Sequence, residues 1–385
     1  MRGRVLVFVS LFLVLAPRLS RAQDVMPSPW MLMSDGLLFT TANHQGGPRG
    51  GDEFVSTNWW MGMASRTAGK GQLTLTGMLS LDPATATARG YREIFQSGEV
   101  YKGEPIVDRQ HPHDLVMQAA FSWRVPIDYQ TGFTIAGGPI GEPAVGPTAF
   151  MHRPSAADNP AAPLGHHTLD STHIAMGVVS AALDHGPFTI EASLFNGREP
   201  DDNRWDVMDP GALDSWSVRE WYEPSPAWQF QVSYGFLKEP EAAEPGDIKR
   251  TTASGAWLKR RPDGFTAATV AVGRNDTDHG AFHTLLAEAT DRRGLTSFYG
   301  RLETTQKETL PSAVTALTLG AVREVSKWRG YEIGIGGDVT GYAVPDAARP
   351  AYGGHPISFH VFMRVRPPAG HMGRMWNMRM TKPMS

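Results

Sequence analysis

Hydrophobic and polar residues alternate with a period of two along many stretches of the chain. Between residues 228 and 236, Trp228, Phe230 and Val232 fall on one face, while Gln229 and Gln231 fall on the other. The same alternation recurs at 72–81, 187–194 and 331–339. This pattern predicts strands that have one apolar face and one polar face.

The lengths of the connections between these strands indicate which β fold they form. Candidate strands lie near residues 30–41, 54–66, 71–82, 114–125, 131–138, 173–184, 187–196, 213–222, 227–237, 248–259, 264–274, 281–290, 295–305, 313–324, 330–342 and 356–366. Every second connection is a short turn, whereas the others are longer and reach about thirty residues at 83–113 and 139–172. Strands of about 10 residues with short turns at one end and long loops at the other are typical of outer-membrane barrels.

The sequence therefore predicts an all-β fold, a transmembrane antiparallel β-barrel of about 16 strands with long extracellular loops and short periplasmic turns. Fourteen or twelve strands are the alternatives, because the segments near 30–41 and 281–290 alternate poorly. Several tryptophans, among them Trp59, Trp216, Trp221 and Trp228, fall near predicted strand ends, where aromatic girdles are expected. We expect at least one long loop to fold into the lumen.

The two termini predict the domain organisation. Arg2 and Arg4 precede an apolar run of about a dozen residues, and Ser20 and Ala22 follow it, which indicates a cleaved signal peptide at 1–22. The barrel is expected at 23–368 and a Met-rich periplasmic tail at 369–385. The expected location is the outer membrane of a Gram-negative cell, with lipid as one partner.

The amino-acid composition excludes several classes of function for this protein. The chain contains no cysteine, so it has neither a disulfide framework nor a thiolate metal site. The net charge of -3 argues against a nucleic-acid partner. His167, Asp170, Ser171 and His173 include the residue types of a nucleophilic triad, but no catalytic motif surrounds the serine, so the protein is not expected to be an enzyme.

Histidines in the two longest loops are candidate metal ligands. In an extended chain the side chains of His111 and His113 point the same way, so both could face one ion. The predicted ligand set is His111, His113, Asp114, His152, His166, His167 and His173. Imidazole nitrogen suits copper(II), with zinc as the alternative. A hydrogen-bonded loop network without a metal would use the same residues.

Methionines near the C-terminus form a second candidate site. Met372, Met375, Met378 and Met380 are spaced so that a flexible tail could gather several thioethers around one copper(I) ion. A disordered basic tail in which methionine is incidental is the alternative.

Four long segments resemble an uncharacterised family of Gram-negative outer-membrane or secreted β-barrel proteins. They are GGPRGGDEFVSTNWWMGMA, GYREIFQSGEVYKGEPIVDRQHPHDL, GPTAFMHRPSAADNPAAPLGHHTLDSTHIAMGVV and FNGREPDDNRW. The resemblance implies an envelope barrel and brings no assigned activity. In its loop histidines and Met-rich tail the chain also resembles the outer-membrane components of copper-resistance systems, although the Met/His segment of those proteins precedes the barrel.

Two functions follow from the sequence. One is a pore or binding protein for a small solute or metal ion, with copper handling as the leading candidate. The alternative is a closed, plugged barrel with a structural or surface-interaction role.

Overall fold

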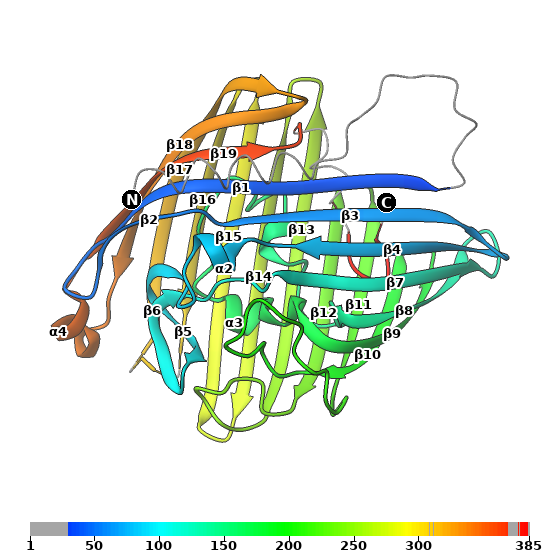
Figure 1. The fold of residues 1–385 in the computed structure, drawn as a ribbon, viewed down its shortest axis with the longest axis horizontal. Coiled ribbons are helices and arrows are strands. Elements are labelled where there is room, and N and C mark those ends of the chain that lie inside the picture. The colour runs from blue at the N-terminus through cyan, green and yellow to red at the C-terminus, as the bar shows by residue number, and fades with distance from the viewer. Residues whose placement is uncertain (1–29, 308, 311, 369–375, 377, 384–385) are drawn as a thin grey trace.

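The computed structural model describes residues 30–307, 309–310, 312–368, 376 and 378–383. Within these ranges, sixteen antiparallel strands form a closed barrel (Figure 1). The strands are β1 (Met31–Gln45), β3 (Asn58–Ala68), β4 (Gly71–Leu79), β7 (Val116–Pro126), β8 (Thr131–Gly141), β9 (Ala175–His185), β10 (Phe188–Asn196), β11 (Ser215–Ser225), β12 (Trp228–Leu237), β13 (Ile248–Arg261), β14 (Gly264–Thr277), β15 (Gly280–Arg293), β16 (Thr296–Thr305), β17 (Val314–Trp328), β18 (Tyr331–Ala343) and β19 (Ile357–Arg366). Closure comes from β1, which pairs with β3 at one end of its length and with β19 at the other. The predicted fold class and the strand count of 16 are confirmed.

The barrel is apolar outside and polar inside. On β10, Phe188, Ile190 and Leu194 are about half exposed, while Glu191 and Ser193 are buried. This is the reverse of a water-soluble protein, and it matches a barrel whose outer face contacts lipid. No helix in the described ranges is both long and apolar enough to span a bilayer.

Aromatic side chains line the outer face near the short turns. Phe188 stacks on Tyr222 with ring centroids 4.8 Å apart, and Trp228 stacks on Phe230 at 5.7 Å. The girdle prediction was wrong for two tryptophans: Trp59 and Trp221 are buried, because their strands turn these side chains toward the lumen.

The connection between β8 and β9, residues 142–174, folds into the lumen and is buried along almost its whole length. It contains three single turns of helix: η1 (Phe150–His152), α3 (His166–Leu169) and η2 (Ser171–His173). Buried ion pairs attach it to the barrel wall: Arg153 donates to Glu288 on β15 at 2.7 Å, and Asp158 pairs with Arg364 and Arg366 on β19. We call residues 142–174 the plug segment.

The other long connection carries a hairpin that the sequence pattern did not predict. After α2 (Asp82–Thr85), strands β5 (Tyr91–Tyr101) and β6 (Glu104–Gln110) form a separate two-stranded sheet. Ile94 and Phe95 pack against Tyr342 and Tyr352, close to η3 (Asp346–Ala348) and α4 (Arg349–Tyr352). The short β2 (Gly51–Val55) pairs with the end of β1 in the same region.

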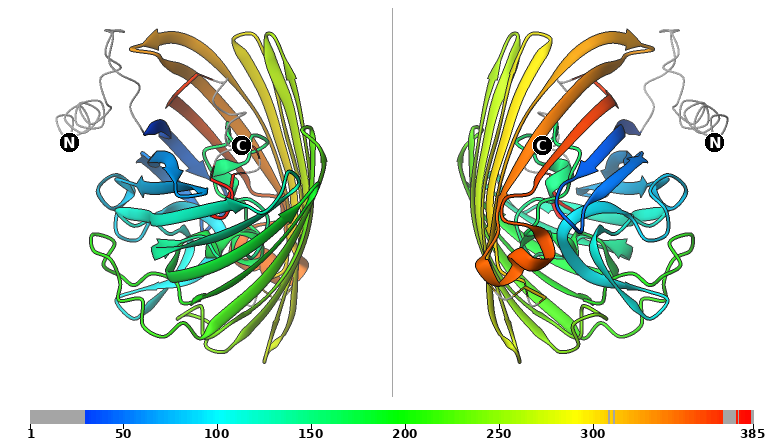
Figure 2. Two further views of the ribbon diagram at one scale, coloured as in Figure 1. Left: turned by 90° about the vertical axis from the view of Figure 1, so that its right-hand side faces the viewer. Right: turned by 90° about the vertical axis from the view of Figure 1, so that its left-hand side faces the viewer.

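The described part of the C-terminal tail also lies inside the barrel, between its opposite walls (Figure 2). Arg379 donates to Glu191 at 2.8 Å, and Lys382 donates to Glu223 at 2.7 Å. The tail is therefore held against the inner face of β10 and β11.

Candidate metal centre

Five of the predicted histidines meet inside the barrel, although they come from two different connections. His111 and His113 follow β6, and His166, His167 and His173 belong to the plug segment. The centroids of neighbouring rings lie 5.6 Å apart for His167 and His111, 6.5 Å for His111 and His113, 6.0 Å for His113 and His173, 5.4 Å for His173 and His166, and 5.6 Å for His166 and His167. The five rings form a closed circuit, which we call the imidazole cluster.

Each ring is held at its Nδ1 atom by an oxygen outside the cluster. The partners are Glu99 for His111 at 3.1 Å, Asp82 for His113 at 2.8 Å, Asp170 for His166 at 2.7 Å, the backbone oxygen of Asp170 for His173 at 2.7 Å, and Glu199 and Glu241 for His167 at 3.0 and 3.3 Å. An oxygen that accepts from Nδ1 fixes the tautomer of a neutral ring and leaves a lone pair on Nε2. Metal-ligating histidines in proteins almost always have such partners.

Three of the Nε2 atoms are buried and have no hydrogen-bond partner: those of His111, His166 and His173. A buried polar atom without a partner calls for an explanation, such as an ion or water at that place. Two imidazoles on one tetrahedral zinc ion would have ring centroids roughly 5 Å apart, given zinc–nitrogen distances of about 2.0–2.1 Å. The observed separations of 5.4–6.5 Å are wider, and among the described residues no three of these histidines bring ring nitrogens within 4.8 Å of one another, so binding one ion requires the rings to move closer together.

Burial and charge affect these histidines differently. Burial lowers the pKa of His166 to about 4 and that of His173 to about 3. Both rings are therefore neutral at pH 7, the form that binds metals. Burial also opposes the charged form of His167, but Glu199 and Glu241 outweigh it and raise the pKa of His167 to about 10.

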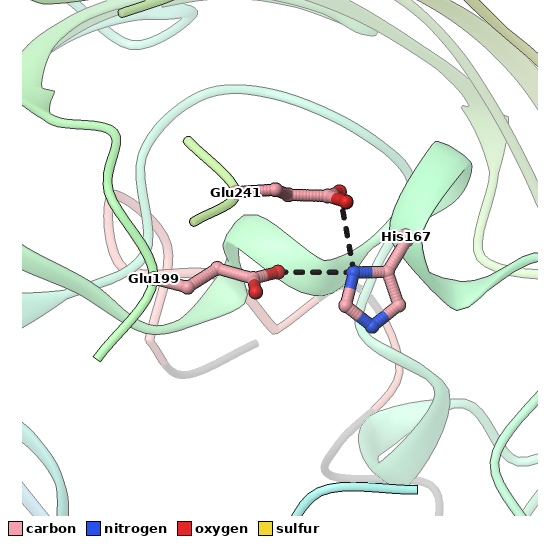
Figure 3. A group of neighbouring side chains, drawn as sticks. All are labelled: His167, Glu199 and Glu241. Atoms are coloured by element: carbon pink, nitrogen blue, oxygen red, sulfur yellow. Dashed lines mark hydrogen bonds and ion pairs between the residues drawn. The ribbon is translucent and has the colours of Figure 1, made fainter. Parts of the chain in front are cut away.

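His167, Glu199 and Glu241 place three ligand atoms within 4.8 Å of one another, which no other group of His, Asp and Glu residues does in the described part of the chain. In Figure 3, Nδ1 of His167 faces both carboxylates, and the other ring nitrogen lies away from them.

Two predicted ligands lie outside the imidazole cluster. Asp114 accepts from Arg204 at 3.2 Å, so its charge is already paired. The ring of His152 packs edge-on against Trp59, with centroids 5.1 Å apart. Neither side chain is brought to the Nε2 atoms of the cluster.

The methionines of the tail are not gathered around one point in the described residues. Met378 packs in an apolar cluster with Trp59 and Met61, whereas Met380 packs in another with Phe195. Met372 and Met375 lie outside the described residues.

The oxygens that orient the rings were not predicted from the sequence. Asp82, Glu99, Glu199 and Glu241 belong to three different connections of the barrel, and Glu241 is 74 residues from His167. The strings RQHPHD and GHHTLDSTH do carry a signal, since Asp170 lies four residues after His166 and bonds it across one helical turn.

Comparisons with known proteins show the fold. No family model matches the chain, and no curated protein matches it. Among solved structures it is similar to an anion-selective porin from Comamonas acidovorans, with 12% identity over 88% of this chain and 99% of that one, and a TM-score of 0.52. OmpF of Salmonella typhi in complex with daunomycin matches 89% of this chain and 100% of its own, with 10% identity and a TM-score of 0.53.

A loop-deletion variant of OmpT, an outer membrane protein of Vibrio cholerae, matches 88% of this chain and 100% of its own, with 10% identity and a TM-score of 0.51. At 10–12% identity these neighbours show the fold alone, and they give no support to the likeness to copper-resistance systems. The chain has the fold of a Gram-negative outer-membrane porin, and an apolar outer face that suits that membrane.

Proposed function

We propose that this outer-membrane barrel binds a transition-metal ion on the imidazole cluster of its plugged lumen. The observation that carries the proposal is the orientation of the rings: each Nδ1 is held by an oxygen, and three buried Nε2 atoms have no partner. A loop network without a metal would account for the Nδ1 contacts, but the three Nε2 atoms would then need buried water as their partner.

Copper(II) is the first candidate ion and zinc the second. Neutral imidazole suits both, and nitrogen sites bind copper(II) most tightly among the divalent first-row metals. Copper(I) would prefer thioethers, whereas the ligands of the cluster are imidazoles, which favours the divalent ion.

A closed, structural barrel is the second candidate function, and the ion pairs of the plug segment favour it. Arg153, Asp158 and their partners on β15 and β19 are all buried. We therefore infer that passage of an ion or small solute requires movement of the plug segment, which these pairs hold in the lumen. Planar-bilayer recordings test this: steps of conductance support a pore, and their absence supports a closed barrel.

Metal titration of the folded protein in detergent, after removal of metals with a chelator, tests the proposal. Copper(II) and zinc are added in competition with an indicator, and wild type is compared with the double variant His166→Asn/His173→Asn. His185→Asn is the matched control, because His185 is exposed at the end of β9. We expect wild type and the control to bind one ion tightly and the double variant to lose it. Equal binding by all three proteins, or none by wild type, would overturn the proposal.

A further inference from the structure

His167 belongs to two groups of ligands. Its ring is part of the imidazole cluster, but its Nδ1 atom lies 3.0 Å from Glu199 and 3.3 Å from Glu241. Because Nδ1 bonds two carboxylate oxygens, it carries a hydrogen in this arrangement. Glu199 lies in the connection between β10 and β11, and Glu241 in the connection between β12 and β13. Both connections are among the longer ones, opposite the short turns.

One oxygen of the Glu199 carboxylate has no hydrogen-bond partner and is available to a ligand. Its Oε2 atom is buried and accepts no hydrogen bond. Beside it is a cavity of about 10 Å³, lined by residues that include Thr172, Glu199, Glu241 and Arg250, which is about the volume needed for one water molecule. The side chain of Glu199 is 16% exposed, slightly more than those of His111 and His113 at 13% and much more than that of His166 at 1%, whereas the side chain of Glu241 is 5% exposed. Glu199 is therefore the carboxylate that an ion from the solvent would reach first.

The surrounding connections are strongly acidic. Residues 197–214 contain six acidic and two basic residues, and residues 238–247 contain four acidic and one basic residue. Acidic clefts concentrate cations and raise their association rates. Arg250 opposes this charge locally, since it lines the same cavity, and it is held there by Thr172 and by the carbonyl oxygen of His167.

We propose that Glu199, Glu241 and His167 form a capture site that takes a divalent transition-metal ion from the outside and delivers it to the imidazole cluster. The inference rests on the proposed function, because the cluster is the destination. The ion binds carboxylate oxygens and Nδ1 of His167, whose proton is released to water. His111 and His166 are the neighbouring ligands in the cluster, each with its ring centroid 5.6 Å from that of His167.

Stopped-flow loading of the metal-free protein with zinc tests the capture site. A fluorescent indicator follows the fall in free zinc as the protein takes it up. The proteins compared are wild type, Glu199→Gln/Glu241→Gln and the control Glu239→Gln. Glu239 is a more exposed glutamate in the same connection as Glu241, with its side chain 58% exposed. Heat-dependent electrophoretic mobility verifies that each barrel is folded, and the single variant Glu199→Gln serves if the double variant does not fold.

We expect the double variant to load about 10-fold more slowly or worse, and to lose the salt dependence of wild type, while its tight-binding stoichiometry is unchanged. The control should load like wild type. Equal loading rates for all three proteins would overturn the capture site and leave the imidazole proposal intact. Zinc binding that survives His166→Asn/His173→Asn but not Glu199→Gln/Glu241→Gln would instead retain the carboxylate site and overturn the imidazole cluster as its destination.

Discussion

The carboxylate of Asp170 accepts from Nδ1 of His166 at 2.7 Å, and both side chains are fully buried in the plug segment. The second oxygen of Asp170 accepts from Arg153 at 2.6 Å, which itself donates to Glu288 on the barrel wall. A single carboxylate thus orients a candidate ligand and links it to the pairs that hold the plug segment in place.

Asp170→Asn is expected to weaken metal binding by about 10–100-fold, because a histidine without its carboxylate partner is less basic and less well oriented. Competition titration with copper(II) measures the effect. Asp338→Asn is the matched control, since Asp338 makes a contact of the same length, 2.7 Å, with His360 on the barrel wall. Equal losses in the two variants would indicate general damage rather than a role in the site.

Arg153→Met is expected to loosen the plug segment, because Asp170 and Glu288 would lose a buried cation. Breaking a buried pair in this way typically costs about 3–5 kcal/mol. Limited proteolysis within 142–174 and bilayer conductance should both increase. Arg124→Met provides the comparison: its pair with Asp184 is open to solvent, with the two side chains 45% and 25% exposed, so a change of only about 0–1 kcal/mol is expected. Unchanged protease resistance in Arg153→Met would contradict the assigned anchoring role.

The stability of the hairpin β5–β6 is expected to depend on pH through Glu93. Burial and the neighbouring Glu303 raise the pKa of Glu93 to about 8, against the opposing charges of Arg301 and Lys307. Since the pKa is higher in the folded state than its ordinary value of 4.5, the stability from the neutral carboxyl is complete below pH 4.5 and is lost as pH rises through about 8.

Glu93→Gln should therefore slow hydrogen exchange of residues 91–110 at pH 9 relative to wild type, with a much smaller difference at pH 5. Glu104→Gln, an exposed change on the same hairpin, should have no effect at either pH. An equal effect of Glu93→Gln at both pH values would contradict the raised pKa.

A chain that ends at Pro368 is expected to keep the tight metal site and to have a more accessible lumen. It loses the contacts of Arg379 and Thr381 with Glu191 and of Lys382 with Glu223. Metal titration and bilayer conductance of the truncated protein measure the two effects. Loss of the tight site in this variant would place methionines of the tail, which include Met372 and Met375, among the ligands.

The alternation of residues predicted all sixteen barrel strands, because every second side chain must face lipid and the next must face the lumen. Even the weakly alternating segments near 30–41 and 281–290 are strands, β1 and β15, since pairing with neighbours on both sides compensates for a poor local pattern. The sequence did not predict the inward tail, because partners such as Arg379 and Glu191 are 188 residues apart. It did not predict the hairpin β5–β6 because register shifts interrupt the pairing of these strands and with it the alternation of their residues.

The candidate site was predicted only in part, because local spacing identifies neighbours along the chain but not contacts between distant segments. The spacing of His111 and His113 and of His166 and His167 marked them as neighbours along the chain. Their meeting in one cluster depends on two connections folding into one lumen. The pairing of Asp114 with Arg204, which removes it from the ligand set, was equally outside the reach of local spacing.

X-ray absorption at the metal edge of the loaded protein tests the imidazole cluster most directly. We expect three or four nitrogen ligands at about 2.0–2.1 Å for zinc, with the multiple scattering that imidazole rings produce. The number of imidazole ligands should fall in His166→Asn/His173→Asn. A shell of oxygen or sulfur ligands without imidazole scattering in the wild-type protein would contradict this expectation.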